Sequence, residues 1–331
     1  MKAKLKLFAV AAAGLVTGFS AAAASAQPAS EASTYPSRAI RMIVPYPPGG
    51  GADNVARVIA SKLSANLKQT IVVDNRAGAS GVIGTAAVVN APNDGYTLLF
   101  TVSSLIQSAA LGTPPPYNAL KDLSPISEVA QTNFVLLANT SVPANTLKAF
   151  IELAKANPGK FNNGSFGNGT SAHLFGEVLK TMAGIDMTHV PYKGTAPMML
   201  ALAGGQIPVG FSDVGAARSF LYSGKLKAFA ATGTTRFPIL PDVPTFQELG
   251  IEGMDLNGWY GLFAPANTNP EIVRKLSREV AGIVRLPEVA ATFNNAGIKA
   301  VGGTPEAFAA SLQQDEPRWT QLIRQTGVTA N

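Results

Sequence analysis

The chain has 331 residues and a formal net charge of +6, of which three lysines within the first six residues supply half and leave +3 for the rest. This mild charge and the lack of a basic run argue against a nucleic-acid partner. The chain has no cysteine, which excludes disulfides, thiolate metal sites and a cysteine nucleophile. Its length is that of one large domain or two medium ones.

The first residues have the pattern of a secretory signal peptide. After the basic start, residues 7–19 are apolar, and residues 24–26 (Ala-Ser-Ala) fit the small-x-small cleavage rule. We therefore expect a signal peptide over residues 1–26, cleavage after Ala26, and an exported, soluble mature protein that begins at Gln27. Beyond this run, no segment approaches the roughly 20 uninterrupted apolar residues of a membrane-spanning helix.

Residues 40–53 predict a strand that ends in a glycine turn and leads into a helix. Ile40 to Val44 form a short apolar strand, the prolines that follow end it, and apolar residues at helical spacing begin at Val55. Gly49 to Gly51 would let a ligand approach the main chain, and the N-terminus of a helix favours negative charge. The segment is a candidate anion-binding site, and a tight strand-to-helix connection is the alternative.

The next segments continue this alternation of strands and helices. Strands are expected at 70–75 and 96–101, with a glycine-rich turn at 76–84 between them. The third strand leads into Ser103 and Ser104. Each strand therefore ends at a polar or glycine loop, which predicts a parallel sheet with a site along the carboxyl ends of its strands.

Residues 160–173 repeat the design in the second half of the chain. Glycines and hydroxyl residues precede the next helix: Ser165, Gly167, Gly169, Thr170 and Ser171. Each hydroxyl could donate to a carboxylate, while Thr170 or Ser171 could equally be the N-cap of the helix, and one group can do both. The spacing Gly-x-Gly-x-x-Ala also matches a loose dinucleotide fingerprint, which is common by chance and unsuited to an exported protein.

The remaining chain predicts more strands and a helical tail. Strands are expected at 134–138, 207–213, 227–232 and 257–265. Helices are expected at 270–284, 287–295, 305–313 and 315–325.

The residues available for catalysis are few. His173 lies near the start of a helix, close to Ser171 and Thr170. A serine hydrolase that uses Ser171 or Ser165 with His173 is therefore an alternative function. The chain has no Gly-x-Ser-x-Gly elbow, and a histidine in the first turn of a helix more often makes a structural hydrogen bond. No spacing of histidines or acidic residues suits a metal. The sequence lacks a catalytic constellation, whereas it has several candidate binding loops.

Several motifs run through the chain in a fixed order: Val44-Pro45-Tyr46-Pro47-Pro48-Gly49-Gly50-Gly51-x-Asp53, Val73-Asp74-Asn75-Arg76-x-Gly78, Asp94-Gly95-Tyr96-Thr97-Leu98, Gly164-Ser165-x-Gly167-x-Gly169-Thr170-Ser171, Val190-Pro191-Tyr192-Lys193-Gly194, Leu240-Pro241-Asp242-Val243-Pro244-Thr245 and Gly258-Trp259-x-Gly261. Together they resemble Bug-type extracytoplasmic solute receptors, the substrate-binding proteins of tripartite tricarboxylate transporters. Any one motif alone would be weak.

The resemblance implies an α/β, two-domain periplasmic-binding-protein fold of type II-like form. Each domain would be a mostly parallel sheet flanked by helices, and the chain would cross the hinge twice. Residues 27–135 with 256–331 would form the first domain and residues 136–255 the second. The two would close on a ligand like a hinged clamp.

In that family the ligand carboxylate lies between two glycine-rich loops and is bound largely by backbone groups and ordered water. Carried over to this chain, the first glycine loop comprises Gly50, Gly51, Ala52 and Asp53. The second glycine loop comprises residues 165–171, with Ser165, Gly167, Gly169, Thr170 and Ser171 as the contacting residues. Asp53 would either bind an amine or hydroxyl of the ligand or cap its helix. Strand ends and loops supply further candidates for lining the site: Tyr46, Ser103, Ser104, His189, Lys193, Asp213 and Trp259. Tyr46 stands where the family often has phenylalanine, which leaves specificity open.

The resemblance thus implies a periplasmic receptor that binds a small carboxylate and delivers it to membrane permease subunits. It implies no cofactor and no metal, and we expect a monomer. A serine hydrolase and a sensor receptor uncoupled from transport remain the alternatives. The ligand stays open among dicarboxylates, tricarboxylates, aromatic acids, amino acids and neutral molecules.

Overall fold

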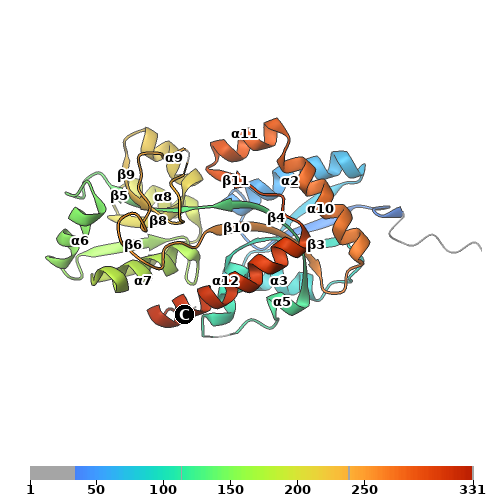
Figure 1. Cartoon of the computed structure of the whole chain (residues 1–331), viewed down its shortest axis with the longest axis horizontal. Helices are drawn as coiled ribbons and strands as arrows, with labels where there is room; N and C mark the ends of the chain where they lie inside the picture. Colours follow the sequence, from blue (N-terminus) through green and yellow to red (C-terminus); the bar gives the residue numbers. More distant parts are fainter. Residues whose placement is uncertain (1–33, 113, 238, 330–331) are drawn as a thin grey trace, which may run out of the picture.

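The computed structural model describes residues 34–329 except 113 and 238. The expected signal peptide and its cleavage site lie outside the described residues. The described chain forms two lobes that are joined by long strands (Figure 1). Within this part of the chain, no helix is long and apolar enough to cross a membrane.

The first lobe is built on a sheet with the strand order β11-β4-β10-β3-β1-β2. The strand bounds are β1 Ile40–Val44, β2 Ile71–Asn75, β3 Thr97–Val102, β4 Leu123–Thr132, β10 Gly258–Pro265 and β11 Ile298–Ala300. β1 pairs in parallel with β2 and β3, so the carboxyl ends of these three strands share one edge, as the sequence predicts. β10 and β4 run antiparallel to their neighbours, as does β11.

The second lobe has a sheet with the order β7-β6-β8-β5-β9. Its strands are β5 Phe134–Asn139, β6 Phe161–Ser165, β7 Met187–Pro191, β8 Val209–Asp213 and β9 Leu226–Ala231. β6 is parallel to β7 and β8, whereas β5 is antiparallel to β8 and β9. The α/β fold class is confirmed, but both sheets are mixed rather than mostly parallel, because the strands that carry the chain between the lobes run against the β-α-β units.

The chain changes sheet at two places that lie against each other. β4 passes into β5 through Asn133, and the chain returns between Ala231 and Gly258. The Asn133 side chain donates to the carbonyl oxygen of Thr232, and the Thr232 hydroxyl accepts the N–H of Phe134 at 2.9 Å. Because β5 begins at Phe134, the domain boundary expected after residue 135 falls inside a strand.

Helices cover both faces of each sheet. In the first lobe they are α2 Gly51–Leu67, α3 Val82–Val89, α4 Ser104–Gln107, α5 Ala119–Asp122, α10 Pro270–Val284 and α11 Pro287–Asn295, with 3₁₀ turns η1 Ala79–Gly81 and η2 Ser108–Ala110. In the second lobe they are α6 Leu147–Lys155, α7 Ser171–Ala183, α8 Thr195–Ala203 and α9 Val214–Tyr222. The apolar stripe of α2, which includes Val55, Ile59 and Leu63, is buried against the first sheet and α10, as its spacing predicts.

The last helix, α12 (Pro305–Thr326), runs beside the crossing strands from the first lobe to the second (Figure 1). It replaces the two helices expected on either side of residue 314, and Pro317 lies inside it. Proline removes one helical hydrogen bond, but buried side chains continue on both sides of it, with Phe308 before and Trp319 after. Trp319 packs on Phe175 of α7 with ring centroids 5.5 Å apart, so this helix connects both lobes.

Candidate functional site

The first glycine loop forms the start of α2, at the carboxyl end of β1. Gly50 is the N-cap residue, and as a glycine it has no side chain to accept a hydrogen bond from the first turn of the helix. The N–H groups of Gly51, Ala52 and Asp53 have no carbonyl partner within the helix, since the first turn lacks residues four positions earlier. Together with the helix dipole, these groups form a place where an anion is stabilised.

Asp53 stabilises the first glycine loop through hydrogen bonds to its buried carboxylate. The residue is 2% exposed. One carboxylate oxygen accepts hydrogen bonds from the Gly49 N–H and the Arg57 Nε–H, both at 2.9 Å, and the other accepts one from Asn75 Nδ2 at 2.9 Å. Burial raises the pKa of Asp53, but the hydrogen bonds from Arg57, Gly49 and Asn75 outweigh it, and the net pKa lies below the ordinary value. Asp53 was expected either to bind the ligand or to cap its helix. Its hydrogen bonds stabilise the start of α2, but it does so from the first turn of the helix and not from the N-cap position.

A residue that the sequence reasoning missed lies directly over the first glycine loop. Tyr260 of β10 is 4% exposed, and its Oη lies 2.9 Å from the position that a Cβ on Gly51 would take. Its neighbour Trp259 was expected to line the site, but its indole packs in the hydrophobic core against Phe263 and Phe308. Adjacent strand residues point to opposite faces, and the sequence did not show which face of β10 meets α2.

The second glycine loop joins β6 to α7. Gly167 and Gly169 have φ values of +147° and +67°, which side-chain-bearing residues rarely adopt. A Cβ on Gly169 would lie 2.4 Å from a methyl of Leu111 in the first lobe. Thr170 occupies the N-cap position of α7, but its hydroxyl donates to the Gly167 carbonyl at 2.7 Å and does not cap the helix.

The second glycine loop contacts the first lobe at several points. Ser171 Oγ accepts a hydrogen bond from Gln107 Nε2 at 2.9 Å and lies 3.3 Å from Ser103 Oγ. Ser80 donates to the Asn168 carbonyl at 3.0 Å. The structure therefore brings two expected site residues, Ser103 and Ser171, into direct contact across the two lobes. Gln107 was missed, because a single glutamine in a short helix carries no motif.

The two histidines stack on each other beneath the second glycine loop. The ring centroids of His173 and His189 are 3.7 Å apart and the rings are nearly parallel. His173 Nδ1 accepts the Gly169 N–H at 3.1 Å, and His189 Nε2 lies 2.7 Å from Ser165 Oγ. Burial lowers the pKa of each histidine to about 4, with the positive charge of Lys180 and, for His189, the other imidazole adding to the effect. Both rings are neutral near pH 7 and support the loop.

This geometry does not assemble the serine–histidine pair of the hydrolase alternative. The hydroxyl of Ser171 is bonded to Gln107, and the partner of Ser165 is His189 rather than His173. Within residues 34–329 as described, no cluster of three His, Cys, Asp or Glu residues could hold a metal ion.

The other expected site residues are dispersed around the strand ends. Tyr46 Oη lies 3.4 Å from Thr101 Oγ1, and Ser104 is buried at the first position of α4. Asp213 caps α9 by accepting the Ala216 N–H at 2.9 Å, and burial raises its pKa. Lys193 is exposed after β7.

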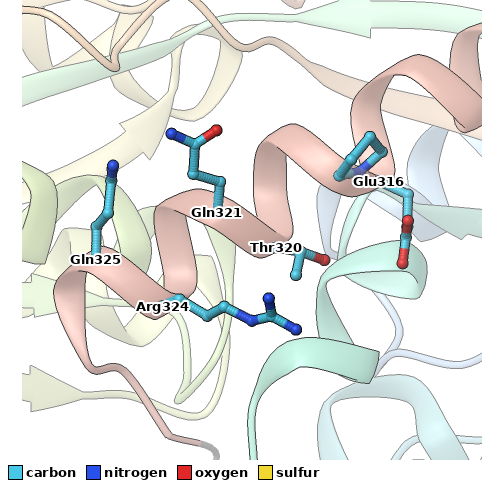
Figure 2. A pocket seen from close by; sticks show the side chains of 6 residues that line it. Glu316, Thr320, Gln321, Arg324 and Gln325 are labelled. Carbon is cyan, nitrogen blue, oxygen red and sulfur yellow. The ribbon is translucent and has the colours of Figure 1, made fainter.

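A surface pocket lies away from all of these residues. It is lined by one face of α12: Glu316, Pro317, Thr320, Gln321, Arg324 and Gln325 (Figure 2). The pocket contains no residue that the sequence singled out.

Comparison with known proteins places this architecture in one family. Residues 55–328 match the model of the tripartite tricarboxylate transporter family receptor. Protein BugT of Bordetella pertussis is 37% identical over 311 residues, which cover 93% of this chain and 95% of BugT.

Two solved structures agree with this assignment. The periplasmic binding protein BugD superimposes with a TM-score of 0.82 at 34% identity and covers 89% of this chain and 99% of its own. The R. palustris protein Rpa4515, solved with adipate, has a TM-score of 0.84 at 31% identity and covers 89% and 99%. With two lobes joined by crossing strands and a glycine loop in each, this chain belongs to the tripartite tricarboxylate transporter receptor family and is a Bug-type periplasmic solute-binding receptor.

Proposed function

We propose that this receptor captures a small carboxylate between its two lobes and presents it to the membrane subunits of a tripartite transporter. The observation that carries the proposal is the open start of α2, whose N–H groups meet no helical acceptor and whose shape is held by the buried Asp53. A carboxylate satisfies such N–H groups without a buried counter-charge. The adipate in the structure of Rpa4515 supports an acid of this kind as the ligand.

The proposed site combines the two glycine loops with the strand ends between them. The first loop supplies backbone N–H groups, and the second supplies the hydroxyl of Ser171. Because Ser171 already meets Gln107 and Ser103 of the first lobe, closing the lobes brings both loops to one cleft. Closure excludes water and strengthens each hydrogen bond to the ligand.

We also propose two domains, with the first boundary moved from residue 135 to Asn133, where the chain leaves the first sheet. The first would comprise residues 27–133 with 256–331, and the second the residues between them. The mature chain would start at Gln27 and act as a monomer. No bond of the ligand would be broken, since His173 faces Gly169 and the Ser165 hydroxyl beside His189 is engaged with the Gly167 carbonyl.

Thermal denaturation of residues 27–331 tests the ligand class. Adipate, L-malate, citrate and benzoate would each be compared with the corresponding amide. A ligand at 100 times its dissociation constant adds about 2.7 kcal/mol of stability, which is readily seen as a higher Tm. We expect at least one acid to raise the Tm and its amide to leave it unchanged. Equal shifts with acid and amide, or no shift with any acid, would contradict the proposal.

Turnover is tested separately with the His173→Ala variant. The methyl esters of the same acids would be incubated with the native protein and with the variant and followed by NMR. We expect no hydrolysis by either protein. Hydrolysis by the native protein that the variant loses would establish the hydrolase alternative.

A further inference from the structure

The tyrosine over the first glycine loop has a fixed position. The ring of Tyr260 belongs to the buried cluster of the first lobe and stacks on Phe100, with centroids 6.5 Å apart and an interplanar angle of 26°. Because the ring is held on its faces and edges, the hydroxyl points to one place, which is the start of α2 beside Gly51.

This hydroxyl is unusual in having no partner. Tyr260 is 4% exposed, yet among the residues that the structure describes its Oη makes no hydrogen bond. Two other tyrosines of the same lobe have partners: the buried Tyr35 donates to the Gly95 carbonyl at 2.8 Å, and the partly buried Tyr46 lies 3.4 Å from Thr101 Oγ1. Although the ring is buried, the hydroxyl oxygen itself is not fully covered, so it is free to donate to a group that enters the site.

The backbone groups beside the hydroxyl suit an anion. On one side are the N–H groups of Gly51 and Ala52, which have no helical acceptor. On the other side is the second lobe, whose Asp213 lies near enough to raise the pKa of Tyr260 further, after the larger effect of burial. The phenol therefore keeps its proton at neutral pH and can donate. The oxygens of Asp53 are already taken by Gly49, Arg57 and Asn75.

We propose that Tyr260 is a ligand-binding residue whose hydroxyl donates a hydrogen bond to the carboxylate held at the start of α2. The inference rests on the proposed function and names the side-chain donor of that site. Backbone N–H groups accept many geometries of anion, whereas a hydroxyl held by a buried ring fixes where one carboxylate oxygen lies. Tyr260 thereby orients the carboxylate and makes the site selective for it.

The test is Tyr260→Phe in residues 27–331, which removes the hydroxyl alone. The probe is whichever of adipate, L-malate, citrate and benzoate raises the native Tm most, titrated by calorimetry. We expect the dissociation constant to rise about tenfold or more, as for the loss of one hydrogen bond to a charged group. We expect the Tm without ligand to stay the same or rise, because the lost hydroxyl had no partner.

Tyr35→Phe is the matched control. It removes a hydroxyl that is bonded to the Gly95 carbonyl, at the opposite end of β1 from the glycine loop. This variant should lower the Tm and leave the affinity for the same acid unchanged. The two variants thus separate a hydroxyl that serves the fold from one that serves the ligand.

A double substitution tests the contact with the loop. A Cβ on Gly51 would lie 2.9 Å from Tyr260 Oη, so Gly51→Ala displaces the hydroxyl. In the Tyr260→Phe background this displacement is relieved, and we expect Gly51→Ala to weaken binding less there than in the native protein. Additive losses would mean that the hydroxyl and the loop act independently and would contradict the proposal.

The possible results separate the role of Tyr260 from the proposed function of the receptor. Native affinity retained by Tyr260→Phe would overturn the role of Tyr260 and leave the carboxylate receptor intact. Absence of binding by the native protein to all four acids would overturn the proposed function, and the role of Tyr260 with it.

Discussion

Each glycine loop leads from the end of a strand into a helix, but a charged side chain stabilises the first loop and neutral side chains stabilise the second. In the first, a buried carboxylate, Asp53, ties together a backbone N–H, Arg57 and Asn75. In the second, only neutral groups take part: two stacked imidazoles and the hydroxyls of Ser165 and Thr170. The first loop is held entirely by its own lobe, whereas the second is already contacted by Gln107 of the other lobe. We infer that the first loop has its anion-binding conformation before the lobes close, and that the contacts of the second loop with the other lobe depend on closure.

The largest expected effect comes from filling the first glycine loop. Gly51→Val would place a branched side chain where the Tyr260 hydroxyl and the ligand meet. We expect the affinity for the acid identified by thermal denaturation to fall about a hundredfold, equivalent to about 2.7 kcal/mol. Gly282→Val is the control, because a Cβ on Gly282 has no atom within 4 Å. Native affinity in Gly51→Val would show that the start of α2 is not the anion site.

Removing the charge of Asp53 should test whether the first glycine loop, unlike the second, is stabilised by a charged group. Asp53→Asn weakens three partly buried hydrogen bonds, and we expect the free energy of unfolding by urea at pH 7 to fall by about 2 kcal/mol. The folded-state pKa of Asp53 is lowered, so its stabilisation is present above the unfolded pKa of about 4 and is lost as the pH falls through the folded value. The difference between native and variant should therefore shrink below pH 4, and a constant difference would contradict the assignment.

The stacked histidines should make the free energy of unfolding depend on pH over a higher pH range than Asp53 does. Both folded pKa values lie near 4, below the unfolded value of about 6.5, so the unfolded chain binds protons first as the pH falls. Stability should fall from pH 6.5 to pH 4, with a slope that approaches about two protons taken up on unfolding.

The control for this slope is the variant His173→Asn combined with His189→Asn, compared by urea unfolding across the same pH range. The slope should flatten in the variant while the effect of Asp53 below pH 4 persists. An unchanged slope would assign the dependence to other groups.

The smallest expected effect concerns the contact between the lobes. Gln107→Met keeps the volume of the side chain but removes the donor to Ser171. If this bond favours the closed arrangement, ligand affinity falls several-fold, as for one neutral hydrogen bond of about 1 kcal/mol. The change should appear mainly as faster ligand dissociation in stopped-flow measurements. Arg218→Met, which removes a bond to the Asn295 carbonyl elsewhere between the lobes, is a matched comparison.

Local patterns predicted much of this fold. Strand β1, its glycine loop and the apolar face of α2 follow from contiguous residues, and so does the repeat of that design at β6 and α7. These features depend on propensities and turn chemistry within about 20 residues of each other. The family assignment followed from the same motifs and is confirmed by the family model and BugT.

Features that depend on packing between distant segments were not predictable. Period-two alternation puts Trp259 and Tyr260 on opposite faces of β10, but only the assembled sheet shows that Tyr260 is the one over α2. Similarly, the sequence predicted separate helices at 305–313 and 315–325, and only the burial of Phe308 and Trp319 along both lobes explains why α12 is continuous. The orientation of the crossing strands, which makes the sheets mixed, also arises from the lobe arrangement.

The position of α12 gives the receptor an intrinsic optical signal. The chain has two tryptophans, Trp259 at the start of β10 and Trp319 between the lobes. Both indole N–H groups are buried without a hydrogen-bond partner among the described residues, so their emission depends on whether water reaches them. We expect opening of the lobes to separate Phe175 from Trp319, so that intrinsic fluorescence should follow ligand capture without any attached label.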